Sequence, residues 1–209
     1  MRRRGIQIAV VVAGLLPFFW LVFQAFRGEL EAEPIKDVTH RTGLWALRLL
    51  IASLAITPLR RYFGLAAVAP LRRTLGLLAF FYTTLHFLIY AVLDLWDAWS
   101  TLVEDVLERP YITVGVAGFL CLVPLAITST QAWIRRLGKR WVRLHRLAYV
   151  AAILGCIHFL WLVKQDLREP LVYTALLALL LLSRVVAWLR PDWLAALRGR
   201  KRASIPASS

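Results

Sequence analysis

Six apolar blocks of about twenty residues set the strongest limit on how this chain can fold. They cover approximately residues 6–26, 43–58, 74–93, 111–129, 144–163 and 171–189. About twenty apolar residues cross a bilayer core as a helix, and the blocks lack the alternation of barrel strands. The chain is 60% hydrophobic, which leaves too little polar sequence to coat six buried helices in water. We therefore predict an all-α bundle of six transmembrane helices, forming a single domain over residues 1–209.

Basic and acidic residues fall on opposite sides of this six-span topology. Arginines and lysines cluster before the first block, between the second and third, around the junction of the fourth and fifth, and after the sixth. Eleven of the twelve acidic residues lie in the opposite loops, mainly 28–42 and 94–110, and only Asp192 does not. The positive-inside rule places both termini and the tail 191–209 in the cytoplasm. The net charge of +14 is thereby explained by topology and anionic lipid headgroups, and no nucleic-acid partner is expected.

The beginning of the chain has some features of a secretory signal. Three arginines precede the first apolar block, as in the basic start of such signals. The apolar run is too long for a signal, and no small-residue cleavage pattern follows it. We expect a retained first helix.

Two histidines lie at one depth on two of the expected helices. His86 is 13 residues after Arg73 and His158 is 12 after Arg146, so both lie roughly 18–20 Å from the basic edge at about 1.5 Å per residue. Imidazole suits iron, and haem is the usual way for an apolar bundle to hold redox iron. Zinc is disfavoured because no third or fourth ligand lies at that level. We predict that His86 and His158 clamp one haem iron; a neutral imidazole bonded to a neighbouring helix is the alternative for each.

His145 lies near the basic edge, between Arg143 and Arg146. Thirteen residues at about 100° each leave it roughly 140° around an ideal helix from His158, so it does not continue the same face. The residues at its depth on the third block include no usual haem ligand; they are Arg72, Arg73 and Thr74. His145 therefore needs a role different from that of the other two.

Two arginines inside the apolar blocks are costly to bury. Arg48 lies near the acidic end of the second block, and Arg184 about six residues before the basic end of the sixth. Each guanidinium either extends to the interface or pairs with an acid among the helices. Haem propionates would suit Arg48, and a flavin phosphate or a quinone oxygen would suit Arg184. His40, in the acidic loop 28–42, is expected to be solvated.

Two stretches of the chain resemble a known family. They are RRTLGLLAFFYTTLHFLIY (72–90) and TSTQAWIRRLGKRWVRLHRLAYVAAILGCIHFLW (128–161). Both resemble the ferric-reductase-type transmembrane domain, and within it the MsrQ (YedZ) family of bacterial haem-binding membrane subunits. The most specific part is the pattern LGxxW–LHRLxY, from Leu137 and Gly138 through Trp141 to His145 and Tyr149. Length and number of spans agree, so the resemblance covers nearly the whole chain.

The resemblance implies a cytochrome b of the bacterial inner membrane. It would pass electrons from respiratory quinol, through FMN and haem b, to a periplasmic MsrP-like molybdopterin enzyme that repairs oxidised methionines in proteins. The family's histidines carry over to His86, His145 and His158. The related NADPH oxidases stack two haems between four histidines, but Trp99 and Ser100 stand where the third block would need its second histidine. This departure favours one haem near the acidic side and a flavin near the basic side, as in STEAP reductases, and leaves a second haem possible.

Three roles for His145 follow. With Arg72, Arg73 and the flanking arginines it would form an anion-binding pocket for the phosphate of FMN, which is the role we predict. It would otherwise ligate a haem with a non-histidine partner, or bond only a lipid headgroup or a loop carbonyl.

The NADPH-oxidising domain of some relatives has no counterpart in this sequence, which implies quinol or a separate flavin reductase as donor. We predict an electron-transfer subunit rather than the catalytic subunit. The alternatives are a self-contained transmembrane ferric or quinone reductase and a small transporter, although no internal repeat or matching pair of broken halves is visible. Residues 96–109 are expected to form a short amphipathic helix on the outer surface, and Cys121 and Cys156 to be buried apolar side chains.

Overall fold

The computed structural model describes residues 2–94, 102–164 and 166–189, and all the regular elements in these ranges are helical. The long helices are α1 (Arg2–Arg27), α2 (Pro34–Phe63), α3 (Leu71–Ile89), α5 (Pro110–Ile127), α8 (Leu147–Leu162) and α9 (Arg168–Leu189). The short ones are η1 (Ala66–Val68), η2 (Tyr90–Asp94), α4 (Leu102–Glu108), α6 (Gln131–Leu137) and α7 (Lys139–Leu144). Six stretches are long and apolar enough to cross a membrane. This confirms the prediction of an all-α bundle with six membrane-spanning helices.

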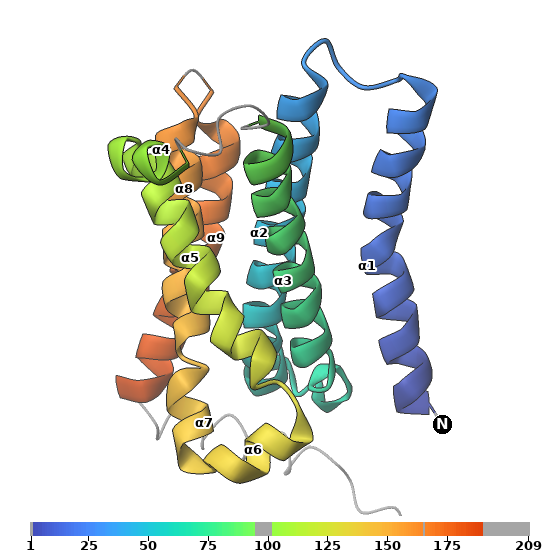
Figure 1. Cartoon of the computed structure of the whole chain (residues 1–209). Helices are drawn as coiled ribbons and strands as arrows, with labels where there is room; N and C mark the ends of the chain where they lie inside the picture. The colour runs from blue at the N-terminus through green and yellow to red at the C-terminus, as the bar shows by residue number, and fades with distance from the viewer. Residues whose placement is uncertain (1, 95–101, 165, 190–209) are drawn as a thin grey trace, which may run out of the picture.

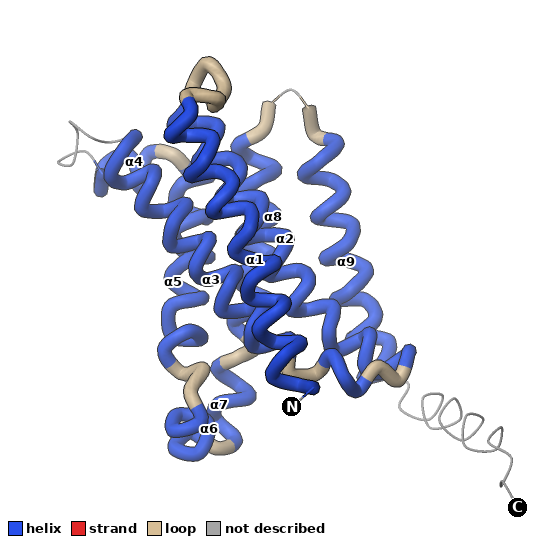
Figure 2. Tube along the Cα trace, turned by 90° about the vertical axis from the view of Figure 1, so that its right-hand side faces the viewer, coloured by secondary structure: helices blue, strands red, loops and turns tan. Residues whose placement is uncertain are grey.

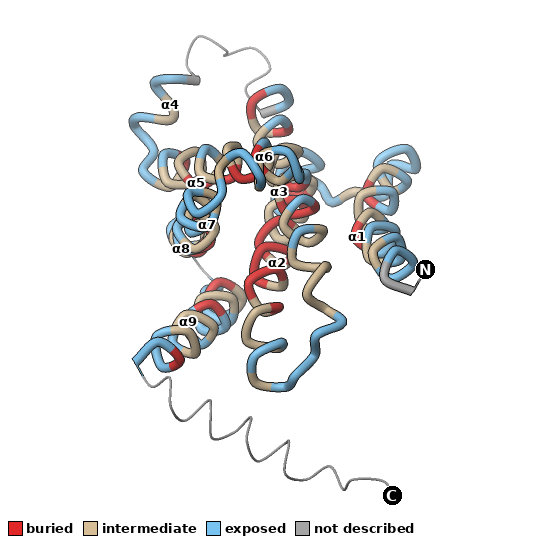
Figure 3. Tube along the Cα trace, turned by 90° about the horizontal axis from the view of Figure 1, so that it is seen from below, coloured by how far each residue is buried: buried red, intermediate tan, exposed pale blue. Residues whose placement is uncertain are grey.

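The bundle is built around two pairs of packed helices, α2 with α3 and α5 with α8 (Figure 1). Helix α1 packs mainly against α3, and α9 lies against α2 and α8 (Figure 2). Seen from below, the buried residues concentrate on α2 and α3, whereas α1 and α9 lie at the periphery with exposed sides (Figure 3). The core contains Leu54, Ala79, Tyr82 and Ala152, each nearly inaccessible to solvent. Apolar side chains cover the outer faces of α1 and α9, as expected for helices that face lipid.

The two ends of the bundle differ in charge. The basic end carries the start of α1 and the short helices α6 and α7, at the bottom of Figure 1. The acidic end carries the loop between α1 and α2 and helix α4, at the top of Figure 1. Residues Trp96 and Trp99 and the tail 191–209 lie outside the described residues.

Helix α2 begins at Pro34, nine residues before the expected boundary at residue 43. Proline at the first helical position and an acidic residue in the first turn both favour a helix start. Arg41 also pairs with Asp37 one turn earlier, with Nε 2.6 Å from Oδ1. His40 is therefore a helical residue, and its expected placement in a loop was wrong.

The expected fifth span, 144–163, is divided in two at its basic end. Helix α7 ends at Leu144 and α8 begins at Leu147, so His145 lies at a break between helices. The angle of about 140° from His158 assumed one continuous helix and does not apply here. Gly138, at φ +50°, turns the chain between α6 and α7, in a region of backbone conformation that favours glycine.

Candidate functional site

His86 on α3 and His158 on α8 face each other inside the bundle. Their ring centres are 6.0 Å apart and the ring planes are inclined by 84°. A metal held between two imidazole nitrogens, each at about 2 Å, separates the ring centres by about 6 Å. The two side chains therefore lie at one level, as the depth argument expected, and at a spacing that fits axial ligation of one iron.

Each of these histidines is oriented by a backbone carbonyl on another helix. His86 Nδ1 lies 2.8 Å from the oxygen of Thr39 on α2, and His158 Nδ1 lies 2.7 Å from the oxygen of Tyr111 on α5. A carbonyl oxygen only accepts, so Nδ1 carries the proton and donates it. The lone pair of each ring is then on Nε2, the nitrogen free to bind iron.

A glycine opens each of these carbonyls to its imidazole. In a helix the carbonyl of one residue lies beside the residue four positions later. That position is Gly43 for Thr39 and Gly115 for Tyr111. A Cβ added to Gly43 would lie 3.0 Å from His86 Nδ1, and one added to Gly115 would lie 2.8 Å from His158 Nδ1. The missing side chains therefore let the rings reach the helix backbone.

The two groups, each made of a carbonyl residue, a glycine and a histidine, share one spacing along the chain. In both, the glycine follows the carbonyl residue by four positions and the histidine follows it by 47. The pairs α2–α3 and α5–α8 thus present their histidines in the same way, although no repeat is evident in the sequence. Sequence reasoning missed both glycines, and the equal spacing to the two histidines is the signal that would have found them.

The pair His86 and His158, called the histidine clamp below, is not completed to a protein-only metal site by other ligands in the described part of the chain. Within the described ranges, no group of three or more His, Cys, Asp and Glu side chains is placed to hold a metal ion. A metal between the two imidazoles would therefore need equatorial ligands from another source. A porphyrin supplies four nitrogens in that plane, so the donor set fits haem.

Arg48 pairs with α9 at the acidic end. Its Nε donates to the Tyr173 hydroxyl at 2.7 Å, and its Nη2 lies 3.2 Å from Glu169 Oε1. The guanidinium also lies 5.4 Å from the centre of the Trp45 ring. The other oxygen of Glu169 is 4.0 Å from His40 Nε2. In this structure Arg48 therefore pairs with a protein carboxylate, and both side chains are partly exposed, at 38% and 45%.

At the basic end, His145 is held by α7. Its ring stacks on Trp141, with centres 3.8 Å apart, and Nδ1 lies 3.2 Å from the Trp141 carbonyl oxygen. Trp141 is itself fixed, because its indole nitrogen donates to the Thr128 carbonyl at 2.9 Å. His145 Nε2 is buried and makes no well-aligned hydrogen bond among the described residues, although the Leu125 backbone is close enough to interact with the ring. A buried nitrogen in this condition is what a missing ligand would explain.

Arg184 closes the same region from α9. Its Nη1 donates to the Tyr149 hydroxyl, and its Nη2 donates to the Leu54 carbonyl at 2.7 Å. That carbonyl lacks its helical partner, because the residue four positions later is Pro58, which has no N–H. Arg184 Nε is buried and makes no hydrogen bond within the described ranges. Arg184 therefore has a structural role in α2 and still offers one donor.

Arg72 completes a basic-end cluster, defined here as His145, Tyr149, Arg184 and Arg72. Arg72 is near enough to interact electrostatically with both His145 and Arg184. Arg73 does not join them, because it is exposed and lines a separate cavity against α1. The flanking Arg143 and Arg146 are exposed as well. Of the residues predicted to hold a flavin phosphate, the structure thus brings together His145, Arg72 and Arg184.

Comparison with known proteins places this architecture in a family. Residues 42–156 match the family described as ferric reductase like transmembrane component. The protein-methionine-sulfoxide reductase heme-binding subunit MsrQ of Xanthomonas axonopodis pv. citri is 52% identical over 167 residues, covering 80% of this chain and 77% of that protein. The subunit of the same name from Rhodospirillum rubrum is 49% identical over 185 residues, covering 88% and 89%. No solved structure matches the chain. The chain therefore belongs to the MsrQ family of ferric-reductase-like transmembrane proteins.

Proposed function

We propose that this protein is a membrane electron-transfer subunit that holds haem b between His86 and His158. It delivers electrons to a partner enzyme that reduces methionine sulfoxide in proteins. The observation that carries the proposal is the pair of imidazoles 6.0 Å apart, both with Nδ1 tied to a carbonyl. The relatives are named heme-binding subunits of a protein-methionine-sulfoxide reductase, which supports it. Haem would supply one-electron redox chemistry at this position.

The protein's own groups would set the properties of that centre. The carbonyls of Thr39 and Tyr111 increase the basicity of the ligating nitrogens and fix the ring orientations. Glu169 already neutralises Arg48 in part. A haem propionate would have to share that guanidinium with Glu169.

The charge distribution supports an orientation in the membrane. We place the basic end in the cytoplasm and the acidic end in the periplasm of the bacterial inner membrane, following the positive-inside rule. The partner would then be a periplasmic molybdopterin enzyme resembling MsrP. Quinol, or a separate cytoplasmic flavin reductase acting through FMN, would supply the electrons.

We place FMN in the basic-end cluster, where Arg72 and Arg184 would hold its phosphate. His145→Ala is expected to lower FMN per polypeptide at least about tenfold and leave the main haem intact, because it removes a buried group from the FMN site only. Quantifying haem and FMN in purified wild-type and variant protein checks this. His40→Ala, a histidine at the opposite end, should retain both groups. Loss of one of two haems would show that His145 is a haem ligand, and unchanged FMN would leave it a structural residue.

The surface of α4 is the docking site we propose for the partner. Glu104 and Glu108 are exposed, whereas Asp105 is engaged with Tyr90 and Arg109. The hydrogen bond with Tyr111 and the charge of Asp105 both raise the pKa of Arg109. Of the acidic segment 94–110, residues 95–101 lie outside the described part of the chain. Glu104 and Glu108 are therefore the described acids of α4 best placed to attract a partner.

The double substitution Glu104→Lys and Glu108→Lys is expected to slow association with the periplasmic enzyme about tenfold or more at low salt, because it reverses the local field. Stopped-flow electron delivery at several ionic strengths measures the effect. The wild-type rate should fall with salt, and the variant should be less sensitive. Glu29→Lys with Glu31→Lys, on the other loop of the acidic end, is the matched control. Equal rates for both double variants would place docking elsewhere.

A reduced-minus-oxidised spectrum of the purified protein tests the proposal as a whole. A b-type haem spectrum is expected, and its absence would refute the electron-transfer role. Steady-state turnover on ferric chelates without any partner would instead favour a self-contained reductase.

A further inference from the structure

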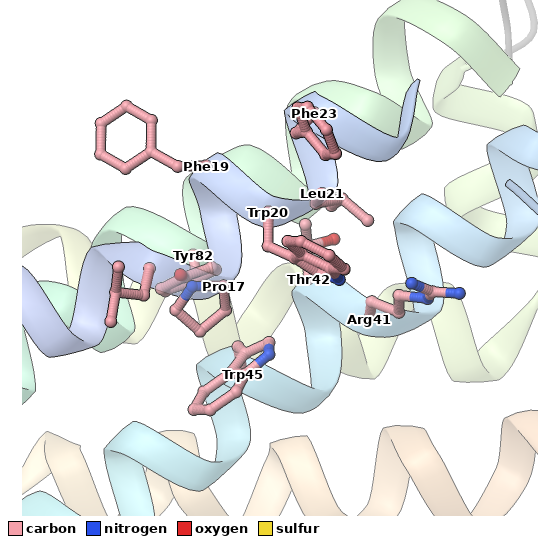
Figure 4. A pocket seen from close by; sticks show the side chains of 10 residues that line it. Pro17, Phe19, Trp20, Leu21, Phe23, Arg41, Thr42, Trp45 and Tyr82 are labelled. Carbon is pink, nitrogen blue, oxygen red and sulfur yellow. The ribbon is translucent and has the colours of Figure 1, made fainter. Parts of the chain in front are cut away.

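A cavity of about 730 Å³ lies between α1 and the α2–α3 pair, in the half of the bundle nearer the acidic end. Figure 4 shows it from close by, with aromatic side chains projecting from both sides. Its lining includes Pro17, Trp20, Arg41, Thr42, Trp45 and Tyr82. The volume falls within the range of small-molecule sites, about 300–1,000 Å³. None of the groups assigned above to haem or FMN lines it.

Tyr82 fixes one end of this cavity. Pro17 interrupts the hydrogen-bond ladder of α1, and the Tyr82 hydroxyl enters the gap. It donates to the Gly14 carbonyl at 2.8 Å and accepts from the Phe18 N–H at 3.1 Å. The hydroxyl thus bridges Phe18 and Gly14, one turn apart on α1, and ties α1 to α3. Beyond this point, the side chains that line the cavity lie between α1 and α2.

Arg41 marks the other end. Its Nη1 donates to Gln24 Oε1 at 2.8 Å, across the space between α2 and α1, and its Nε pairs with Asp37. Asp37 is 8% exposed, and its second oxygen is buried with no hydrogen-bond partner among the described residues. From Pro17 to Gln24 the helix rises about 10 Å. The cavity is therefore a chamber with aromatic walls and one polar end, at Arg41. At the other end Tyr82 is 1% exposed and its hydroxyl is committed to α1.

The chamber adjoins the histidine clamp. Thr42, which lines it, is followed by Gly43, where an added Cβ would lie 3.0 Å from the His86 ring. Tyr82 lies one helical turn before His86 on α3. The backbone of α2 is thus shared by the chamber on one side and by His86 on the other.

We propose that this chamber binds an isoprenoid quinol from the bilayer. The head ring would lie between Trp20 and Trp45, since aromatic rings pair favourably in offset or edge-to-face arrangements. One of its hydroxyl groups would face the Arg41 guanidinium, which bonds Asp37 and Gln24 through Nε and Nη1 and has Nη2 left to donate. The isoprenoid tail would leave past Trp20, which is 59% exposed on the lipid side of α1. A lipid acyl chain would use neither the aromatic walls nor the polar end at Arg41.

This inference rests on the proposed function for the choice of quinol as donor. Oxidation of one quinol to quinone releases two electrons and two protons. Haem held by His86 and His158 would take up the electrons one at a time. The protons would leave toward the acidic end, where the unpartnered oxygen of Asp37 is available to accept one. Entry here would bypass the basic-end cluster, so flavin-derived and quinol-derived electrons would reach the clamp by separate routes.

Photolabelling with an azido-quinone tests the site in the full-length protein reconstituted in nanodiscs. Label is expected on residues 16–23 and 41–45, with competition by unlabelled quinol. Trp20→Ala should weaken quinone binding about tenfold, because one aromatic wall is lost. Trp161→Ala is the matched control, since Trp161 is similarly exposed, at 54%, but lies on α8. Rapid mixing with a short-chain quinol should show slower haem reduction in Trp20→Ala only, with dithionite reduction unchanged in both.

Three results would overturn the proposal: label confined to other segments, equal binding by both tryptophan variants, or lipid rather than quinone recovered from the chamber. They remain distinguishable from failure of the proposed function, because labelling and binding do not depend on haem. Specific label in the chamber of a protein without haem would support the site and refute the haem clamp. If dithionite reduces the haem but quinol does not, and no label is found in the chamber, the quinol site is refuted. The haem site between His86 and His158 is then unaffected.

Discussion

Alanine in place of His86 or of His158 is expected to abolish the main b-type haem spectrum, with haem affinity reduced by at least about 100-fold. Each substitution removes one of two axial ligands, and even loss of a residue that only orients a ligand costs 10–100-fold in metal affinity. Haem per polypeptide and the reduced spectrum of purified variants measure the effect. The two variants should behave alike, because the two ligands have equivalent surroundings.

His40→Ala provides the matched control for this pair. His40 lies toward the same end of the bundle, but its side chain is 44% exposed and its Nε2 faces Glu169. It should retain the wild-type haem content. A six-coordinate haem spectrum of unchanged intensity in either clamp variant would contradict the assignment of the ligands.

Gly115→Ala is expected to lower haem affinity by about 10–100-fold, although Gly115 would not touch the iron. The new methyl group would lie 2.8 Å from His158 Nδ1, so the ring would have to leave the Tyr111 carbonyl. Haem content and the midpoint potential of the remaining haem report this displacement. Gly43→Ala should act in the same direction and less strongly, because its Cβ would lie 3.0 Å from the His86 ring.

Gly118→Ala separates this effect from simple damage to α5. Gly118 is buried on the same helix, three residues later, but a Cβ there would make an ordinary contact of 3.5 Å with Leu154. Haem content and potential should therefore stay near wild type. If Gly115→Ala and Gly118→Ala behave identically, the glycine does not act through the histidine.

The fold class and the common level of His86 and His158 could be predicted before the structure for a physical reason. In a membrane, helices must satisfy their own backbone groups, so block length and composition nearly suffice to identify the spans. A helix also rises by a constant amount per residue, which made the equal depth of His86 and His158 calculable from flanking arginines. The break at His145 was not calculable in this way, because it depends on how α7 packs through Trp141 onto Thr128.

The sequence did not predict which side chains pair with one another across different helices. In the sequence, Arg184 could be recognised only as a charge that is costly to bury. Its acceptor is the Leu54 carbonyl, which Pro58 leaves free on a helix 130 residues away in the chain. Arg72 and Arg73 are adjacent in the sequence, yet only Arg72 joins the basic-end cluster. Helical rotation of about 100° per residue sends neighbouring side chains to different faces, and only packing decides which face meets which helix.

By itself, the sequence determined that this chain forms six apolar helices with opposite charge at the two ends and two histidines at one level, because these depend on local composition and constant helical geometry. Only the tertiary structure decided that Gly43 and Gly115 admit the imidazoles to two carbonyls, and that Tyr82 holds α1 so that an aromatic chamber forms beside α2. Those features arise where helices distant in sequence come within hydrogen-bonding range, and that proximity is set by the packing of the whole bundle rather than by any one segment.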